Sequence, residues 1–483
     1  MIEIESKTKR QELSISKWKE AKGLGTLNLV PRFGKTRIAK LISDRTLEKR
    51  PASKILAVAH NDIAYKNLLN NLSDKVVCMT VHRILLNIVE YDIDWDLIIV
   101  DEIHRFTVGS YLQILNLKSK FKLGLTGDKL AKYPMAMLKD RGYGVIDVIT
   151  EEEAIEQKWI SDFVEYNLPV EIEEHKKAKY SLYSKKITEL MENYGPLYKR
   201  MNTVLNQHVF NNSLDLMFGL YNGIDIRLKN FKKIRLNADV VRNTLSTSMG
   251  WSPNLDPKEP NTARIDKYFN PGVLHEVGKL FGDLVRERND LIINSRNKLD
   301  AVVEIIKAND VPTIIFSEST QMASDIARVL GTSAIEYHSG VESAFITNPK
   351  TGEYFCHANG NPIKFGTTRL KKLAITGLMD GTFKYICTVK ALNESVDIPI
   401  LRQVITTGGT TNPSTHLQRV ARGKTLYDGD LEKITIIINV YIKDFIHNDT
   451  LIPSRDEGKL KIRQADSVVY KVDSIAEIFA NID

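Results

Sequence analysis

Short apolar runs alternate with longer segments of helical periodicity in two stretches of the chain, residues 24–160 and residues 300–445. Strands that alternate with helices predict parallel sheets covered by helices on both faces. In the first stretch we expect strands at Thr26–Val30, Ile55–Ala59, Val76–Thr80, Leu97–Val100, Leu123–Thr126 and Val145–Ile149. In the second we expect them at Thr313–Phe316, Ala334–Tyr337, Tyr385–Val389, Gln403–Thr407 and Ile434–Val440.

The alternation stops between these two blocks. Amphipathic stretches at Tyr180–Met201 and Leu274–Lys307 are typical of long helices. Within the second block, Asn359-Gly360-Asn361 separates two strand-like runs, which predicts a hairpin insertion at residues 341–368. The predicted organisation is a first α/β lobe at 1–168, a helical middle domain at 169–298, a second lobe at 299–450 and a tail at 451–483.

Length and composition agree with a protein of several domains. A chain of 483 residues is too long for one ordinary hydrophobic core. No apolar run approaches the roughly 20 residues needed to cross a membrane, and the N-terminus lacks the features of a signal peptide. Three scattered cysteines (Cys78, Cys356 and Cys387) argue against disulfides and against zinc. We therefore expect a cytoplasmic protein, and its net charge of +7 permits a polyanionic partner without requiring one.

A phosphate-binding loop is indicated by Arg32-Phe33-Gly34-Lys35-Thr36, directly after the first expected strand. Gly34 permits close backbone approach, the following helix supplies a dipole for an anion, and a lysine and a hydroxyl suit phosphate and Mg²⁺. The full Gly-x-x-x-x-Gly-Lys-Thr pattern would place glycine at position 29, where this chain has Leu29. Taken alone, a chance Gly-Lys-Thr at a helix start explains the segment equally well.

A second chemical signal is Asp101-Glu102-Ile103-His104, which follows the apolar run Leu97–Val100. A carboxylate at a strand end helps to hold Mg²⁺, and the next acid can polarise an attacking water. An exposed strand-end turn is the alternative interpretation. Leu125-Thr126-Gly127-Asp128, a further polar segment at a strand end, favours the first. The two signals together predict ATP as substrate and Mg²⁺ as cofactor.

Four segments of the second block complete a recognisable order of motifs. They are Ile315-Phe316-Ser317-Glu318, Tyr337-His338-Ser339-Gly340, Thr388–Pro399 and Gln418-Arg419-Val420-Ala421-Arg422-Gly423. In this order the chain resembles a superfamily 2 nucleic-acid helicase of the DExH type over residues 8–165 and 300–445. The resemblance implies an α/β fold of two RecA-like parallel-sheet lobes with a mainly helical domain inserted between them.

The resemblance also implies residue roles. The implied catalytic residues are Lys35, Asp101, Glu102 and Arg422, with Glu102 as the base and Arg422 as an arginine finger. The implied nucleotide-binding residues are Gln11 (for adenine), Arg32, Gly34, Lys35, Thr36, His104, Asp397 and Arg419, and the implied Mg²⁺ ligands are Thr36 and Asp101. The implied nucleic-acid contacts are His60, Asn61, Thr80, His82, Ser317, Ser339, Gly340 and Thr388. The chain departs from the family pattern at Asp128, Ser395, Ala421 and Thr425, the last standing where a second arginine is usual.

Structural alternatives exist for several of these residues. Gln11 is an ordinary surface glutamine in one interpretation. Asn61 and Asp62 are helix caps in another. The basic residues Arg419, Arg422 and Lys424 can equally form one solvated helix face.

The implied function is ATP-dependent unwinding or remodelling of nucleic acid. The compact length, the shortened phosphate loop and Tyr441–Asp444 look most like bacteriophage recombination and branch-migration DNA helicases. The expected partner is single-stranded, forked or branched DNA, with no membrane and a monomer as the default. An RNA helicase, an ATP-switched DNA-binding scaffold and the motor subunit of a restriction complex remain as alternatives.

Overall fold

A computed structural model of the chain provides the fold. It describes residues 2–127, 130–189, 225–227, 233–235, 271–338, 341, 343–389, 398–408, 416, 419–426, 430, 432–443, 445–447, 450–452, 456–457, 460 and 469–480. These residues form two compact units, which are treated separately below. One consists of residues 1–169, 299–441 and 457–483, and the other of residues 170–298 and 442–456.

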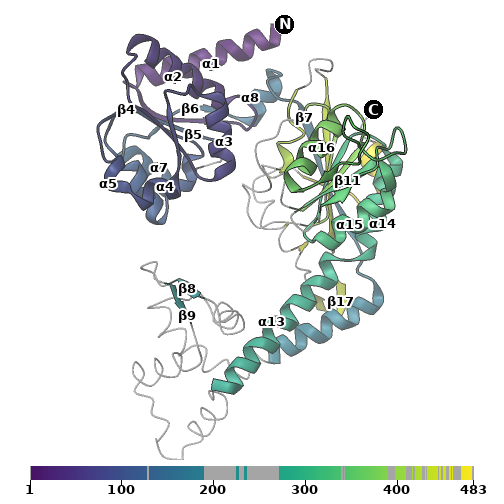
Figure 1. Cartoon of the computed structure of the whole chain (residues 1–483). Helices are drawn as coiled ribbons and strands as arrows, with labels where there is room; N and C mark the ends of the chain where they lie inside the picture. The colour runs from purple at the N-terminus through teal and green to yellow at the C-terminus, as the bar shows by residue number, and fades with distance from the viewer. Residues whose placement is uncertain are drawn as a thin grey trace, which may run out of the picture. The chain divides into compact units, whose positions relative to one another are not determined.

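The first sheet of the larger unit has six strands in the order β3-β2-β4-β5-β1-β6, and all its pairings are parallel (Figure 1). Its strands are β1 (Leu24–Leu29), β2 (Ile55–Ala59), β3 (Val77–Thr80), β4 (Trp95–Val100), β5 (Ser119–Thr126) and β6 (Val145–Ile149). Its helices are α1 (Ile2–Glu20), α2 (Lys35–Lys49), α3 (Asp62–Asn71), α4 (Val81–Leu86), α5 (Ile88–Tyr91), α6 (Leu112–Leu115), α7 (Lys132–Asp140) and α8 (Glu151–Glu156), with 3-10 turns η1 (Ile103–Phe106) and η2 (Gly109–Tyr111).

Successive residues of the central strands enter cores on opposite faces of this sheet. In β4, Leu97 and Ile99 belong to one hydrophobic cluster, while Ile98 and Val100 belong to the other. A parallel strand buried on both faces needs an unbroken apolar run, because side chains alternate between the faces. This explains why the apolar runs of the sequence locate these strands.

The second sheet has seven strands in the order β11-β14-β10-β15-β16-β7-β19. They are β7 (Asp162–Val170), β10 (Thr313–Phe316), β11 (Ala334–Tyr337), β14 (Tyr385–Thr388), β15 (Gln403–Thr406), β16 (Ile434–Ile442) and β19 (Tyr470–Lys471). The accompanying helices are α14 (Arg296–Ala308), α15 (Thr320–Leu330), α16 (Thr367–Met379) and α19 (Ile475–Ala480), with a 3-10 turn η3 (Gly331–Ser333). Every strand predicted from the sequence is present, and the expected fold of two RecA-like lobes is confirmed.

Two strands of this second sheet come from parts of the chain where no strand was expected. β7 follows the first lobe directly in sequence, and β19 lies in the C-terminal tail, where its Tyr470 is in register with Tyr166. Residues 162–168, which the sequence placed at the end of the first lobe, therefore pair with the second sheet.

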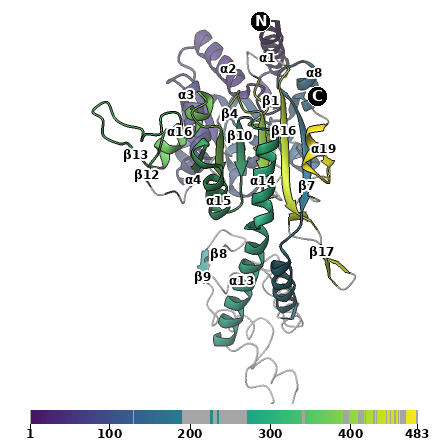
Figure 2. The same cartoon turned by 90° about the vertical axis from the view of Figure 1, so that its right-hand side faces the viewer.

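The segment between β11 and α16 folds as two consecutive antiparallel hairpins (Figure 2). Strands β12 (Ala344–Phe345) and β13 (Lys364–Phe365) close its base. Bridges join Thr347 to Tyr354 and Cys356 to Pro362. The second turn contains Gly360 at φ 83°, a left-handed conformation that glycine adopts without a Cβ penalty.

In the smaller unit, residues 174–189 form a helix that lies beside α13 (Pro271–Ile293) (Figures 1 and 2). The single helix expected over Leu274–Lys307 is instead two, α13 and α14, separated at Asn294 and Ser295. A residue far away in the sequence stabilises the break. Glu173 accepts hydrogen bonds from Ser295 Oγ (2.8 Å) and from the Arg296 backbone N–H (2.7 Å). The other described strands of this unit are β8 (Asp225–Arg227), β9 (Lys233–Arg235), β17 (Phe445–His447) and β18 (Thr450–Ile452).

Within the part of the chain that the structure describes, no helix has both the length and the apolar character needed to cross a membrane.

Candidate functional site

The first lobe brings its two polar segments together at the carboxyl edge of its sheet. The phosphate loop follows β1, and the acidic segment follows β4, with β5 hydrogen-bonded to both strands. Parallel strands end at the same edge, which is where open α/β sheets place their ligands.

The phosphate loop has two residues in the left-handed region, on either side of Phe33. Arg32 has φ 74° and Gly34 has φ 105°. A Cβ at Gly34 would lie 2.5 Å from Gln11 Nε2, so glycine is required there both for conformation and for space. Gly34 is also the N-cap of α2, and no side chain caps this helix end. The backbone N–H groups of the first turn of α2 are therefore suited to an anion.

A chain of polar contacts connects the ends of β1, β4 and β5. Lys35 Nζ lies 3.0 Å from Glu102 Oε1, and Glu102 Oε2 lies 3.4 Å from His104 Nδ1. The same His104 nitrogen is 3.0 Å from Thr126 Oγ1. Glu102 adopts a left-handed backbone with φ 49°, a strained conformation for a residue with a side chain. The predicted catalytic lysine and base are thus in direct contact.

Asp101 is buried beside this chain of contacts. Burial and, to a lesser extent, the negative charge of Glu102 raise the pKa of Asp101 to about 6 against the opposing charge of Lys35. A buried carboxylate with a perturbed pKa, next to a second acid and a lysine, is typical of functional sites. Asp101 and Thr36 supply the hard oxygen donors that Mg²⁺ prefers. The cation would also offset the cost of burying the carboxylate, so these residues fit a magnesium ion.

Gln11 lies on α1 and is 1% exposed, so the surface interpretation is wrong. Its Nε2 donates to the Phe33 carbonyl at 2.8 Å. Its Oε1 is buried and has no hydrogen-bond partner among the described residues. A buried amide oxygen without a partner is costly, and it is suited to accept a hydrogen bond from a bound ligand.

The nucleic-acid candidates of the first lobe lie at the ends of β2 and β3. Asn61 caps α3 by accepting from the Ala64 N–H at 2.8 Å, as the capping alternative predicts, and its Nδ2 lies 2.9 Å from His60 Nε2. Burial lowers the pKa of His60 to about 4, so its ring is neutral at neutral pH. Thr80 is buried, whereas His82 is exposed.

Two aromatic residues beside these candidates were missed from the sequence. The Tyr111 hydroxyl lies 3.1 Å from His82 Nε2, and the Arg83 guanidinium lies 5.2 Å from the centroid of the Tyr65 ring. Aromatic rings interleaved with cationic groups are the composition of surfaces that bind single-stranded nucleic acid. Tyr65 lies on α3 and Arg83 on α4, with β3 between them, so no local motif links the two residues.

The described candidates of the second lobe are buried. The Thr388 hydroxyl donates to the Tyr337 carbonyl at 2.7 Å, and Ser317 accepts from Thr407 at 3.3 Å. A contact from Ser317 or Thr388 to a nucleic-acid backbone would need local rearrangement. Five further residues of interest lie outside the described part of the chain: Asp128, Ser339, Gly340, Ser395 and Asp397.

The basic residues near position 420 do not form a solvated face. Arg419, Arg422 and Lys424 are 5%, 3% and 2% exposed, so that alternative is wrong. The Arg419 guanidinium lies 5.3 Å from the Phe316 ring centroid, and Lys424 pairs with Glu151. Burial lowers the pKa of Lys424, and Glu151 opposes that shift. Buried cations are retained where a specific partner offsets their desolvation.

Comparisons with known proteins find only distant similarity to solved structures. No family model matches the chain, and the search of curated proteins also finds no match. The helicase domain of Hef from Pyrococcus furiosus is 16% identical with a TM-score of 0.48, over 90% of this chain and 95% of that one. The ATP-dependent type ISP restriction-modification enzyme LlaBIII, solved bound to DNA, is 13% identical with a TM-score of 0.47. That alignment covers 95% of this chain but only 29% of LlaBIII. Similarity at this level carries nothing about substrate.

Proposed function

We propose that the chain is an ATP-dependent motor on nucleic acid whose output is the unwinding or remodelling of branched DNA. The observation that carries the proposal is the connected set Lys35, Glu102, His104 and Thr126 at the carboxyl edge of the first sheet. It joins a lysine at a helix N-terminus, a carboxylate suited to act as base, a histidine, and one residue from a third strand end, Thr126. That combination suits phosphoryl transfer better than a structural ion pair.

In the proposed reaction, the N–H groups at Gly34, Lys35 and Thr36 and the Lys35 ammonium bind the phosphates of ATP. Thr36 and Asp101 would hold Mg²⁺, which would supply charge neutralisation on the phosphate oxygens. Glu102 orients the attacking water and accepts its proton. The contact between Lys35 Nζ and Glu102 Oε1 fixes the direction of the carboxylate at the site.

The remaining candidate residues have defined tasks in this proposal. Gln11 presents its buried Oε1 to the exocyclic amine of adenine, which guanine lacks at that position. Arg422 delivers a guanidinium toward the transferring phosphate, and Asp397 and Arg419 are assigned to nucleotide binding. His104 contacts both Glu102 and Thr126, so a movement of the Glu102 side chain is transmitted to the end of β5.

For the nucleic acid, we assign the track along the ends of β2 and β3. His60, Asn61, Thr80 and His82 contact the backbone, and Tyr65 with Arg83 extends the same surface. Ser317, Ser339, Gly340 and Thr388, which belong to the second lobe, are assigned as further nucleic-acid contacts. Because phosphate contacts release counterions, binding should weaken steeply as salt rises.

The test is a steady-state ATPase assay with no polymer, single-stranded DNA, forked DNA, four-way DNA and RNA. Glu102→Gln should abolish hydrolysis but retain nucleotide binding. Glu90→Gln, at an exposed position on α5, is the matched control and should leave the rate unchanged. Strong stimulation by branched DNA supports the proposal.

Other outcomes select the alternatives. Stimulation by RNA alone would replace the proposal with an RNA helicase. Nucleotide binding without hydrolysis on any polymer would indicate an ATP-switched scaffold, consistent with Thr425 in place of a second arginine. Activity that appears only with a separate nuclease subunit would indicate a restriction motor.

A further inference from the structure

The phosphate loop of this chain carries large residues where close turns favour small ones. Arg32 holds a left-handed backbone at φ 74°, which is unfavourable for a residue with a Cβ, and Phe33 follows it. A strained loop of this kind keeps its backbone conformation only when neighbouring residues stabilise it. In this chain the stabilising contacts come from α1.

Two consecutive carbonyls of the loop accept hydrogen bonds from α1. Lys7 Nζ donates to the Arg32 carbonyl at 3.0 Å, and Gln11 Nε2 donates to the Phe33 carbonyl at 2.8 Å. Carbonyl oxygens directed into a phosphate site would repel the anion, whereas N–H groups attract it. By taking up both carbonyls, α1 keeps them away from the site and leaves the next N–H groups of the loop for phosphate.

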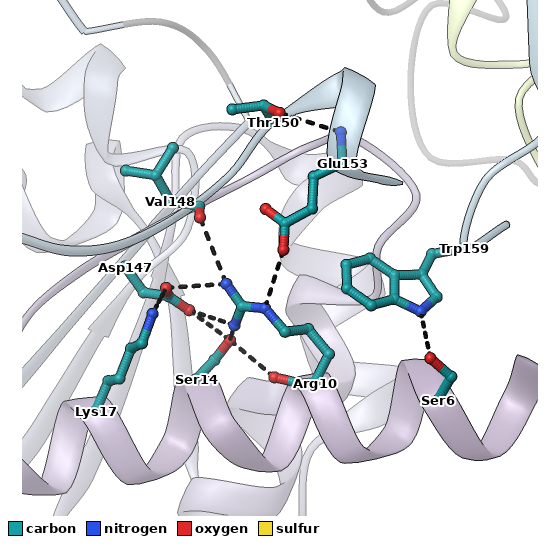
Figure 3. A network of polar contacts seen from close by, with 9 residues as sticks. All are labelled: Ser6, Arg10, Ser14, Lys17, Asp147, Val148, Thr150, Glu153 and Trp159. Carbon is teal, nitrogen blue, oxygen red and sulfur yellow. Dashed lines mark hydrogen bonds and ion pairs between the residues drawn. The ribbon is translucent and has the colours of Figure 1, made fainter. Parts of the chain in front are cut away.

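Lys7 also binds a second segment. Its Nζ donates to the Trp159 carbonyl at 2.9 Å, and the Trp159 ring packs edge-on against Phe33 with centroids 5.3 Å apart. Trp159 Nε1 in turn donates to Ser6 Oγ at 3.2 Å (Figure 3). The ammonium is therefore held between the loop and the segment after α8, and it lies 5.8 Å from the Phe33 ring centroid.

The helix that carries Lys7 is itself anchored. Asp147 of β6 accepts from Arg10 at 2.7 and 3.0 Å, from Lys17 at 2.6 Å and from Ser14 at 2.7 Å (Figure 3). All three donors lie on α1. A helix fixed in this way can hold the loop without moving with it.

We propose that Lys7 is a positioning residue for nucleotide binding: its ammonium holds the strained Arg32 peptide in the orientation that phosphate binding requires. In a glycine-rich loop, small residues adopt the required backbone conformation without strain. In this chain the hydrogen bond from Lys7 stabilises that conformation instead. The inference rests on the proposed function in so far as the loop binds a nucleoside triphosphate. Lys7 acts through the loop and not on the substrate.

The first test is Lys7→Met, which keeps the length of the side chain and removes its donors. Lys9→Met is the matched control, because Lys9 is two residues away on the same helix, is 74% exposed and pairs with Glu5. Two quantities are measured: the Kd of a fluorescent ATP analogue, and hydrogen–deuterium exchange of residues 31–36 without nucleotide. We expect Lys7→Met to weaken binding by about tenfold, the equivalent of one charge-assisted hydrogen bond, and to speed exchange. Lys9→Met should change neither.

A double-mutant cycle with Arg32→Gly separates positioning from general stability. Glycine adopts the left-handed conformation without strain, so Lys7→Met should weaken binding much less in that background. An equal loss in both backgrounds would overturn the inference. Lys7→Arg, which keeps a donor, should restore part of the affinity.

Nucleotide binding by the wild-type protein and hydrogen exchange of the loop test the two proposals separately. A wild-type protein that binds no nucleotide would overturn the proposed function. The exchange measurement would still decide whether Lys7 holds the loop, and unchanged exchange in Lys7→Met would overturn that. Should Lys7→Met not fold, the comparison of Lys7→Arg with wild type in both Arg32 backgrounds provides the same coupling.

Discussion

The ion pairs that anchor α1 allow a quantitative prediction, because the carboxylate at their centre, Asp147, is fully buried. Asp147 has a side chain with 0% exposure, and Arg10, its main partner, has one with 10%. Burial by itself raises the pKa of Asp147, but the hydrogen bonds from Arg10, Lys17 and Ser14 outweigh burial and lower that pKa overall. The perturbation is Arg10→Met, which keeps the aliphatic packing and removes the guanidinium.

The magnitude follows from what the substitution leaves behind. Removing one partner of a buried ion pair typically costs about 3–5 kcal/mol, because the other charge stays buried. Lys17 and Ser14 still bind Asp147 in the variant, at 2.6 and 2.7 Å, so the low end of that range applies. We expect a loss of about 3 kcal/mol in the free energy of unfolding of the first lobe.

A second arginine pair provides the control. Arg45 of α2 binds Glu12 of α1 with two hydrogen bonds of 2.6 and 2.8 Å, so its geometry is equally good. Its side chains are 36% and 42% exposed, and exposed pairs contribute less than about 1 kcal/mol. Arg45→Met should therefore cost far less than Arg10→Met.

The assay is urea denaturation followed by tryptophan fluorescence. Of the four tryptophans, Trp18, Trp95 and Trp159 lie in the first lobe, so the signal reports mainly on that lobe. The difference between the two variants is taken from their midpoints at a common slope. Equal losses for Arg10→Met and Arg45→Met would refute the reasoning, because burial would then not govern the strength of the pair.

Three further outcomes are expected. Because the pKa of Asp147 is lowered, its contribution to stability is complete above about pH 4 and is lost as pH falls through the folded-state pKa; Asp147→Asn should remove that part of the acid sensitivity in thermal melts. Gly34→Ala should weaken nucleotide binding by tenfold or more (about 1.4 kcal/mol), because φ is 105° and the new Cβ would meet Gln11 Nε2 at 2.5 Å; calorimetry of ATP binding tests this. Lys298→Met should cost about 3–5 kcal/mol, because it strands the fully buried Asp456, and Lys298→Met with Asp456→Leu should recover most of that loss in chemical denaturation.

The sequence predicted which residues of the candidate site lie at strand ends. Lys35, Asp101 and Glu102 were placed correctly at one sheet edge because each follows an apolar run, and parallel strands end together. Their mutual contacts did not follow from the sequence, since the 3.0 Å between Lys35 and Glu102 depends on the register of β1, β5 and β4.

Other features carried no local signal at all. The burial of Arg419, Arg422 and Lys424 depends on partners such as Phe316 and Glu151, which are distant in sequence. A basic run looks the same whether it faces solvent or a buried carboxylate. The sequence pattern for this segment therefore left two interpretations open, and only the fold decided between them.

By itself, the sequence determined the two α/β lobes, the positions of their central strands and the sheet edge at which Lys35, Asp101 and Glu102 lie. It did so because a strand buried on both faces must be apolar along its whole length, and such a run is visible in a short stretch of sequence. The tertiary structure alone decided that β7 and β19 complete the second sheet, that Glu173 binds the break between α13 and α14, and that Lys7 donates to the Arg32 carbonyl. These depend on single polar contacts and edge pairings between distant residues. Such contacts impose no periodicity on the chain, so they become visible only when the chain is folded.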